Sequence, residues 1–460
     1  MKHALRRLFK HPAFALTAII TVGAAIGANA LIFSVVNGVI LKPLPYAHPE
    51  TLVGAWLVAP GVMPGELQQS AGTYFMIRDS AQSFEDIGLW QSGSATITGR
   101  GEPEQVETLF VTDGTLPVLG IRPALGRIFT KEDDLPNGPN VVLISHRYWQ
   151  RAFGGSPSAI GQTLMFNGAA REVVGVLPED FRFLRANPLV VVPQKIDRSK
   201  VHAAGFNYQA VARLKPGVTI EQANADVARL LPSLTERFPL PSGFTKKMFD
   251  EARFGSLVRP LDVDVVGDIG NMLWILLGTV GLVLLVACAN VANLFLVRAE
   301  TRRRDMTVRR AIGASRAQLM RFQFTEAFVV AVIAGALAIV LAAITLPIFV
   351  RSAPEGIPRL AEVRMDAFTV GAAFGLVVLV ALACGAAPAI RGSSPDLTGL
   401  RGGGRGSIGG RQWGRDALVV AQTAMALVLL IGSALLLESF QRLRNVDAGY
   451  DVKDVYTFQY

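Results

Sequence analysis

Five apolar runs constrain the fold of this chain more than any other feature of its sequence. One lies near the start, three follow a long polar stretch in quick succession, and one lies near the C-terminus. The runs are residues 14–41, 272–297, 324–350, 368–390 and 417–437. An α-helix needs about 20 residues to cross about 30 Å of hydrocarbon, and each run is at or above that length. The pattern predicts an α-helical integral membrane protein with five transmembrane helices and a large domain outside the bilayer.

The composition agrees with this prediction. Hydrophobic residues make up 51% of the 460 residues although the polar stretch is typical of a water-soluble domain, so the surplus lies in the five runs. A formal net charge of +9 would suit a nucleic-acid-binding protein if the basic residues formed a stripe or a helix face. They cluster instead at the ends of the apolar runs, which argues against a nucleic-acid partner.

The same basic clusters orient the helices. Basic residues precede the first run, follow the second and follow the fourth, whereas the loop after the third run carries balanced charges. Lys and Arg are enriched on the cytoplasmic side of a membrane, and one orientation satisfies all five crossings. The segments predicted to be cytoplasmic are 1–13, 298–321 and the Gly/Arg linker 391–416, and those predicted to be outside are 42–270, 351–366 and 438–460.

The first run has a second interpretation, a cleaved signal peptide, because Ala28-Asn29-Ala30 resembles a small-residue cleavage site. The apolar character continues through residues 31–40, which is too long for a signal-peptide core and favours a retained anchor. Gly23 and Gly27 would let a neighbouring helix approach closely, although two small residues are also tolerated in a lipid-facing helix. Polar residues inside the runs, such as Asn29 and Glu326, predict hydrogen bonds between helices or side chains that snorkel toward water.

The outside segment 42–270 alternates short β-like stretches with Pro/Gly turns and predicts a mixed α/β domain. We expect strands at 106–112, 140–145, 172–176 and 209–214. Asn167-Gly168 precedes the third of these and suits a tight hairpin. Thr219 and Gln222 form a capping box before a helix whose Ala223, Val227, Leu230 and Leu231 share one face.

Nothing in the sequence assembles into an active site, so we expect no catalytic, metal or cofactor residues and no enzyme. His146 and His202 lack further ligands at metal-binding spacing. Glu132, Asp133 and Asp134 are typical of a solvated turn or a helix start. Both cysteines, Cys288 and Cys384, lie inside apolar runs and are expected to pack as small apolar residues. The Gly-rich stretch 402–410 lacks the Lys-Ser/Thr ending of a phosphate-binding loop.

The most specific block is residues 290–321, NVANLFLVRAETRRRDMTVRRAIGASRAQLMR. It resembles the FtsX/MacB-like ABC transporter permease family, in which an Arg-rich cytoplasmic segment and an R-R-A-(I/L)-G-A turn meet the partner ATPase as a coupling helix. Asp305 stands where the family more often has Glu. Gly313 also predicts a helix stop, and Ser315 the cap of a new helix. The resemblance implies an ATPase contact made by Arg302, Arg303, Arg304, Asp305, Arg309, Arg310, Ala311, Gly313 and Ala314.

Further motifs extend the resemblance over nearly the whole chain, among them KPLPYAHPETLV, LGIRPALGRIFTKEDD, NGAAREVVGVLPEDFRF and ARLKPGVTIEQANADV. They imply a periplasmic core domain of MacB type at 42–270 and an FtsX-like permease domain at 272–390. The nearest subgroup is the duplicated orphan permeases, so 417–437 resembles the first helix of a second repeat and 438–460 the start of a second, truncated periplasmic domain. The chain is then expected to be a fragment that pairs with a second permease half or with another copy.

The resemblance implies a multi-pass protein of the bacterial inner membrane, in contact with lipids, that works by transmembrane signalling. A separate cytoplasmic ABC ATPase, which binds the ATP, would push on the Arg-rich segment, and the outer domain would handle peptide, antibiotic-like, lipid or lipoprotein cargo. The alternative is a membrane-anchored scaffold or receptor that binds envelope proteins without an ATPase. An extracytoplasmic enzyme is the least supported hypothesis, for want of a nucleophile, dyad or metal cluster.

Overall fold

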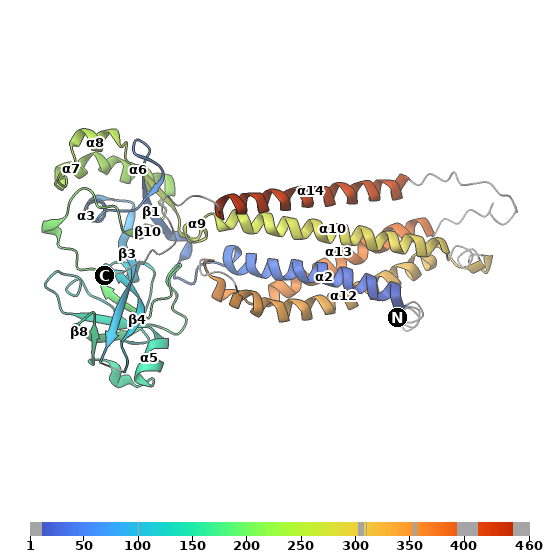
Figure 1. The fold of residues 1–460 in the computed structure, drawn as a ribbon, viewed down its shortest axis with the longest axis horizontal. Helices are drawn as coiled ribbons and strands as arrows, with labels where there is room; N and C mark the ends of the chain where they lie inside the picture. Colours follow the sequence, from blue (N-terminus) through green and yellow to red (C-terminus); the bar gives the residue numbers. More distant parts are fainter. Residues whose placement is uncertain are drawn as a thin grey trace. The chain divides into compact units, whose positions relative to one another are not determined.

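The computed structural model describes residues 12–99, 101–301, 308–309, 311–352, 357–392 and 413–444. The chain forms two compact units. The helical unit comprises Met1–Gly38, Asn271–Ala353 and Leu360–Tyr460, and the outer unit comprises Val39–Gly270 and Pro354–Arg359. Figure 1 shows long helices in the first and strands with short helices in the second.

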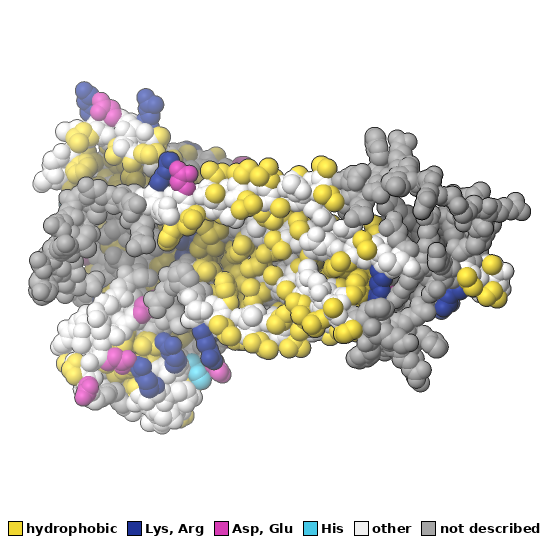
Figure 2. All heavy atoms as spheres, turned by 45° about the vertical axis from the view of Figure 1, so that its right-hand side comes forward, with side chains coloured by type: hydrophobic (Ala, Val, Ile, Leu, Met, Phe, Trp, Pro, Cys, Tyr) yellow, Lys and Arg dark blue, Asp and Glu magenta, His cyan; other side chains and the backbone are white. Residues whose placement is uncertain are grey.

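The helical unit contains the five predicted membrane-spanning helices. They are α2 (Pro12–Val36, continued by a π-helical turn Asn37–Leu41), α10 (Ile269–Thr301), α12 (Arg316–Ser352), α13 (Ala367–Gly392) and α14 (Trp413–Arg444). Each includes a stretch that is long and apolar enough to cross a membrane. Hydrophobic side chains cover the visible face of these helices (Figure 2). The predicted fold class is therefore confirmed.

Small residues bring α2 and α12 into close contact. A Cβ atom added to Gly23 would lie 3.2 Å from the carbonyl oxygen of Ala334, and one added to Gly27 would lie 3.3 Å from that of Ala338. Both alanines are fully buried. The prediction that these two glycines admit a neighbouring helix is confirmed, because side chains at either position would push the backbones apart.

Buried amides add hydrogen bonds between helices, as predicted. The Asn29 side-chain amide donates to the carbonyl of Val280 on α10 at 2.8 Å, and Asn37 donates to the Asp366 carboxylate before α13 at 3.1 Å. Cys288 and Cys384 are free and buried in the helical core, where Cys384 Sγ donates to the carbonyl of Cys288 at 3.5 Å. These cysteines act as packing residues.

In the described part of the outer unit, eleven strands form one sheet in the order β11-β1-β10-β3-β4-β9-β6-β8-β5, with β2 paired to β1 and β7 paired to β3 and β8. Most neighbours are antiparallel, whereas β4–β9 and β6–β8 are parallel. The strands are β1 (Leu52–Ala59), β2 (Met63–Leu67), β3 (Phe84–Thr98), β4 (Glu104–Val111), β5 (Leu125–Gly126), β6 (Val141–Ile144), β7 (Thr163–Phe166), β8 (Ala169–Val176), β9 (Val190–Pro193), β10 (Gln209–Leu214) and β11 (Gly255–Pro260).

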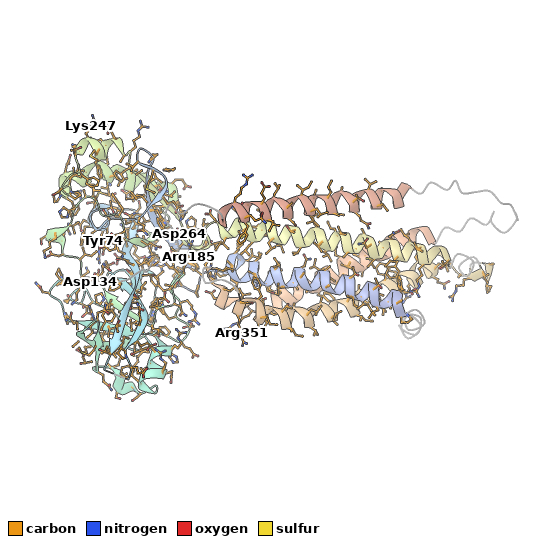
Figure 3. All side chains as sticks on the ribbon, in the orientation of Figure 1. Tyr74, Asp134, Arg185, Lys247, Asp264 and Arg351 are labelled. Atoms are coloured by element: carbon orange, nitrogen blue, oxygen red, sulfur yellow. The ribbon has the colours of Figure 1, made fainter. Side chains whose placement is uncertain are left out.

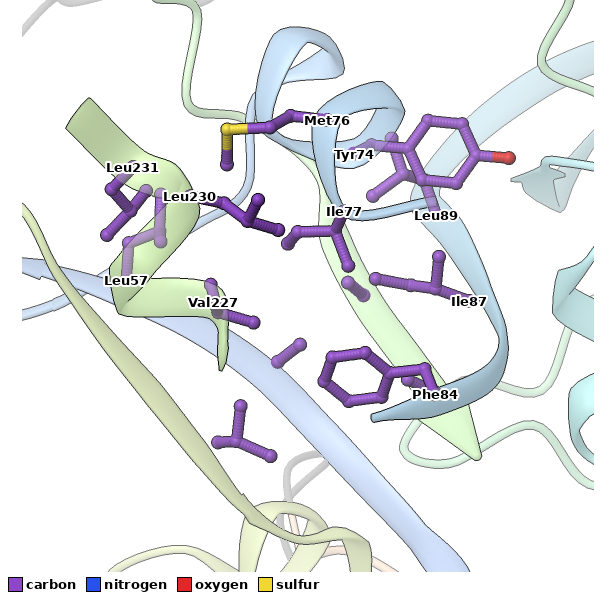
Figure 4. Packing of buried hydrophobic residues seen from close by; sticks show 14 of the residues in the cluster. Leu57, Tyr74, Met76, Ile77, Phe84, Ile87, Leu89, Val227, Leu230 and Leu231 are labelled. Carbon is purple, nitrogen blue, oxygen red and sulfur yellow. The ribbon is translucent and has the colours of Figure 1, made fainter. Parts of the chain in front are cut away.

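Short helices complete the mixed α/β fold. They are α3 (Ala71–Ser80), α4 (Thr115–Val118), α5 (His146–Phe153), α6 (Ile220–Leu230), α7 (Leu234–Arg237), α8 (Lys246–Glu251) and α9 (Leu261–Val266). Buried side chains of α3 and α6, including Ile77 and Val227, pack with Leu57 of β1 and Leu89 of β3 in one core cluster (Figure 4). The burial of these large aliphatic residues stabilises the unit in water.

Three local predictions for this unit are confirmed. The strand β10 has the predicted bounds. Asn167 and Gly168 both have positive φ, at 48° and 77°, and join β7 to β8 in a tight hairpin. Thr219 and Gln222 form the capping box of α6, with Thr219 Oγ1 accepting from the Gln222 amide at 3.3 Å.

Asp133 and Asp134 lie in a turn, as predicted, but the expectation that this turn is solvated is wrong. Asp133 is 1% exposed, and its carboxylate forms a bidentate ion pair with the Arg127 guanidinium. Asp134 accepts backbone hydrogen bonds from Lys195 at 2.8 Å and Asp113 at 3.1 Å. Burial raises the pKa of Asp134 to about 6. For Asp133, burial acts in the same direction, but the Arg127 and Thr130 hydrogen bonds outweigh it and lower the pKa. The turn is thereby bonded to three other parts of the outer unit, at Arg127, Asp113 and Lys195.

Candidate functional site

The Arg-rich segment 298–321, named here the coupling segment, includes the last residues of α10, which ends at Thr301, and the first residues of α12, which starts at Arg316. The predicted contact residues Arg302, Arg303, Arg304, Asp305 and Arg310 lie outside the described residues. The structure describes the other four, which are Arg309, Ala311, Gly313 and Ala314.

These four residues end one helical turn. The amide of Ile312 donates to the carbonyl of Val308, and the amide of Ala314 donates to that of Arg309, both at 3.0 Å. Gly313 has a φ of 100°, which a residue with a Cβ adopts only with strain, so the helix stops here as its glycine predicts.

A new helix begins two residues later. Ser315 Oγ accepts from the amide of Gln318 at 3.3 Å, and Gln318 Oε1 accepts from the amide of Ser315 at 2.9 Å. This reciprocal pair is a capping box, and it starts α12 at Arg316. The stop and the cap together give a defined turn between two helices.

The described part of this turn presents its side chains outward. Ile312 is 82% exposed and Val308 is 57% exposed, and Arg309 and Ala311 are also exposed. Apolar side chains beside arginines at a predicted cytoplasmic surface suit either lipid or a protein partner that offers carboxylates.

Arg298, the first residue of the coupling segment, ties together three helices through an ion pair with Glu326, a partner that the sequence did not predict. Arg298 of α10 pairs with Glu326 of α12 at 2.7 Å, and both side chains are largely buried. The Arg298 guanidinium also lies 4.4 Å from the ring centre of Phe14 on α2, which packs edge-on against Phe295. The sequence does carry a signal for such a pair, because an acidic residue inside one apolar run needs a partner and an arginine stands at the end of another run.

A second unpredicted arginine acts within the outer unit. Arg359, in the loop after α12, is 8% exposed and has a φ of 60°. Its guanidinium donates to the carbonyls of Lys42 at 2.7 Å and Pro43 at 2.9 Å, just after the π-helical turn that extends α2. Arg359 therefore fixes the first residues of the outer unit through charge-assisted hydrogen bonds.

The outer unit also contains a network of charged and aromatic side chains around α9. The Asp264 carboxylate accepts from the Trp56 indole and from Arg259 Nε, each at 2.7 Å, and Arg185 donates to its backbone carbonyl at 2.7 Å. Arg185 and Asp264 are labelled close together in Figure 3. Burial raises the pKa of Asp264, against the lowering effect of Arg259. This network borders a cavity of about 500 Å³.

Among the described residues, no group of three or more His, Cys, Asp or Glu could hold a metal ion. His146 begins α5 and packs edge-on against Trp149. His202 lies in an exposed loop position.

The two units define a class of protein, a membrane protein with a mixed α/β domain inserted between its first two membrane helices. Two family models match the chain: the MacB-like periplasmic core domain at residues 15–230 and the FtsX-like permease C-terminal domain at residues 277–397. The chain belongs to the FtsX/MacB-like ABC transporter permease family. The resemblance noted in the sequence is confirmed.

Several curated relatives are similar over about half of the chain. The uncharacterized ABC transporter permease YknZ of Bacillus subtilis is 23% identical over 53% of this chain and 58% of its own length. The pyoverdine export ATP-binding/permease protein PvdT of Pseudomonas syringae is 23% identical over 50% of this chain and 34% of its own. The macrolide export ATP-binding/permease protein MacB of Chromobacterium violaceum is 26% identical over 49% and 33%. The chain thus spans only part of each relative.

Solved structures of related outer domains are also similar. The extracellular domain of the noncanonic ABC-type transporter YknZ from Gram-positive bacteria has a TM-score of 0.33 at 16% identity, covering 45% of this chain and 99% of that one. The periplasmic region of MacB from Actinobacillus actinomycetemcomitans has a TM-score of 0.34 at 14% identity, covering 50% and 93%.

Proposed function

We propose that this ABC transporter permease works by transmembrane signalling in the bacterial inner membrane. A separate cytoplasmic ABC ATPase engages the coupling segment through Arg309, Arg310 and their neighbours. The helices pass its movement to the outer unit, which handles peptide, antibiotic-like, lipid or lipoprotein cargo on the periplasmic side. The chain pairs with a second permease half or a second copy.

One observation carries this proposal: the coupling segment joins two long uninterrupted helices. At 1.5 Å per residue, a helix the length of α10 or α12 extends about 50 Å. The first residue of α10, Ile269, follows α9 of the outer unit after only Gly267 and Asp268. A push on the segment therefore has a short covalent route into the outer domain.

The contacts inside the helical unit support joint movement of its helices. The Gly23 and Gly27 contacts hold α2 against α12, and the Arg298–Glu326 pair holds α10 to α12. An ion pair in an apolar setting loses much energy if its partners separate, so these helices are expected to shift as one body.

The ATPase contact is tested by cross-linking in living cells. A photoreactive amino acid replaces the exposed Ala311, and the adduct is then challenged with a photoactivatable ATP analogue. We expect an adduct with an ATP-binding protein that disappears in the R309E/R310E double variant, because the charge reversal repels a carboxylate-bearing partner.

The matched control, R351E/R364E, reverses the charge of two exposed arginines in the segment 351–366, which is predicted to lie outside, and should leave the adduct intact. An adduct that survives R309E/R310E, or one with a protein that does not bind nucleotide, contradicts the proposal and favours the scaffold or receptor alternative.

The orientation is tested by cysteine labelling. Cysteines introduced at the exposed positions Gln150 and Ala311 should react with an impermeant maleimide on opposite sides of the membrane, and the native cysteines are buried. Equal labelling of both positions in intact spheroplasts contradicts the orientation.

A further inference from the structure

The cavity beside α9 lies on one face of the outer sheet, across the neighbouring strands β11, β1, β10, β3 and β4. Trp90 of β3 pairs directly with Gln209 of β10, and Ser92 lies two residues further along β3. On the other side of β10, Trp56 is two residues from Gly54, which pairs with Arg259 of β11. Alternate residues of a strand share a face, so these side chains form a continuous floor.

The wall of the cavity is the end of α9 and the residues that lead into α10. Val265, Gly267 and Asp268 line it, together with the loop residues Leu184, Arg185 and Ala186. α9 lies directly on the sheet, because a Cβ atom at Gly54 would meet the Asp264 carboxylate at 2.5 Å. The site is therefore built partly from the connection between the outer unit and α10.

The lining carries more negative than positive charge. Its carboxylates are Glu66, Glu107, Asp264 and Asp268, and its cations are Arg185 and Arg259. Arg259 is neutralised by Glu66 and Asp264, and Arg185 donates to the backbone carbonyls of Asp264 and Val265. Within the described part of the chain, no ion pair involves Glu107 or Asp268. Both carboxylates are exposed, and Glu107 Oε1 accepts only a long hydrogen bond, at 3.3 Å, from the backbone amide of Asn187, so both can meet a cation.

Two indoles add an aromatic surface. The Trp56 ring has the Arg259 guanidinium 5.5 Å from its centre, so this cavity already holds a planar cation against an aromatic face. Trp90 is 5% exposed and is fixed by edge-on packing against Phe183. Fixed aromatic rings beside carboxylates are the combination that recognises organic cations.

We propose that this cavity binds a small organic cation with a planar aromatic part. Glu107 and Asp268 attract its charge, while Trp56 and the small exposed part of Trp90 contact its ring. A volume of about 500 Å³ accommodates a drug-sized molecule. Binding orders the connection to α10, because Asp268 and Gly267 belong to it.

Gly267, in the connection between α9 and α10, is the residue at which ligand binding can act on the backbone. Gly267 has a φ of 54°, and a Cβ atom there would meet Arg185 Nη2 at 2.8 Å. A glycine in this conformation is a point where the chain direction changes easily. A ligand held between Asp268 and the sheet would restrict that change.

The test uses the full chain in phosphatidylcholine nanodiscs and ethidium, a planar aromatic cation, as the probe. We expect saturable binding, seen by fluorescence and calorimetry, and slower hydrogen exchange in residues 261–268 when ethidium is bound. The E107Q/D268N variant should bind about tenfold more weakly because it lacks both attracting charges. The matched control, E179Q/D180N, removes two exposed carboxylates elsewhere in the outer unit and should bind as the unmodified chain does.

A second variant, S92W, fills the floor and should abolish binding whatever the charge. The aromatic anion 8-anilinonaphthalene-1-sulfonate should not bind in this cavity, so any binding that it shows should be the same in S92W as in the unmodified chain. The inference is overturned if ethidium shows no saturable binding. It is also overturned if ethidium binds E107Q/D268N and S92W as tightly as it binds the unmodified chain. The measurement needs no ATPase, so its failure is separate from failure of the proposed function.

Discussion

The cores of the two units are built from different side chains. In the outer unit leucine is the commonest member of the cluster between α3, α6 and the sheet, which also includes Tyr74, Phe84 and Phe238. In the helical unit alanine is the commonest member of the core cluster, and Phe295 is its one buried aromatic residue among those described. Both cores are buried, but they fill their space with residues of different size.

The difference follows from the solvent. In water, burying large apolar side chains is the main driving force for folding, so the outer core uses them. In hydrocarbon, an apolar side chain gains little from burial, and helices associate by close approach and by hydrogen bonds. The outer core should therefore be sensitive to lost volume, and the helical core to added volume.

The largest expected effect is that of L89A in the outer core. Leu89 is fully buried on β3, and its truncation leaves a cavity that should lower the free energy of unfolding of the outer unit by about 4 kcal/mol. Urea denaturation of the full chain in nanodiscs measures this change. If Trp274 and Trp413 are replaced by Phe, the fluorescence reports only Trp56, Trp90 and Trp149 of the outer unit.

The control is L435A on α14, where Leu435 is 60% exposed within the described structure. The same deletion should there change the stability by less than about 0.5 kcal/mol. Similar losses from both substitutions would remove the contrast between the two cores.

A smaller effect is expected from pH, through Asp134. Its pKa is about 6 in the folded unit, against an ordinary value of 3.8, so the folded state binds more protons between these two pH values. The contribution of Asp134 to stability is therefore fully present below about pH 4 and is lost as pH rises through about 6. The loss is at most about 3 kcal/mol.

The measurement is the urea midpoint of the outer unit from pH 4 to 7.5, compared with D134N, which does not titrate. Asp133 and Asp226 have lowered pKa values and act in the opposite sense, so the difference between the two proteins isolates Asp134. Parallel pH profiles would show that Asp134 is solvated, as its sequence suggested.

The helical core is tested by added volume with A334L. Ala334 is fully buried on α12 where Gly23 crosses it, so a larger side chain should separate the helices and destabilise the unit by about 2 kcal/mol. The matched control is A336L, an exposed position on the same helix. Thermal aggregation in detergent should begin at a lower temperature for A334L alone. An equal shift in both variants would mean that α2 and α12 are not closely packed.

Local signals account for what the sequence predicted. The five apolar runs, the Asn167-Gly168 hairpin, the Thr219 cap and the Gly313 stop each depend on residues close together in the chain, and the structure contains all of them. Their geometry is fixed by short-range sterics and hydrogen bonds, so a single sequence specifies it.

The features that the sequence did not predict depend on residues far apart. Asp134 is half-buried because Lys195 and Asp113 return to it, and Arg359 is buried because the chain after α12 meets Pro43. The cavity beside α9 requires the order of five strands, of which β10 and β11 follow the others by a long interval. Periodicity carries no information about which distant partner a charged side chain meets.

The smallest effect compares two capping boxes of the same design, one in each unit. T219A removes the cap of α6, an 11-residue helix whose buried face anchors it to the sheet, and should lower the free energy of unfolding of the outer unit by about 1 kcal/mol.

S315A removes the cap of α12, which has 37 residues and continues into a membrane-spanning stretch. Its loss should fray only the first turn, because the rest of the helix cannot unfold in hydrocarbon without exposing backbone groups. Hydrogen exchange should therefore accelerate throughout α6 in T219A but only near Ala317–Leu319 in S315A. Acceleration deep into α12 would show that water, not lipid, surrounds that helix.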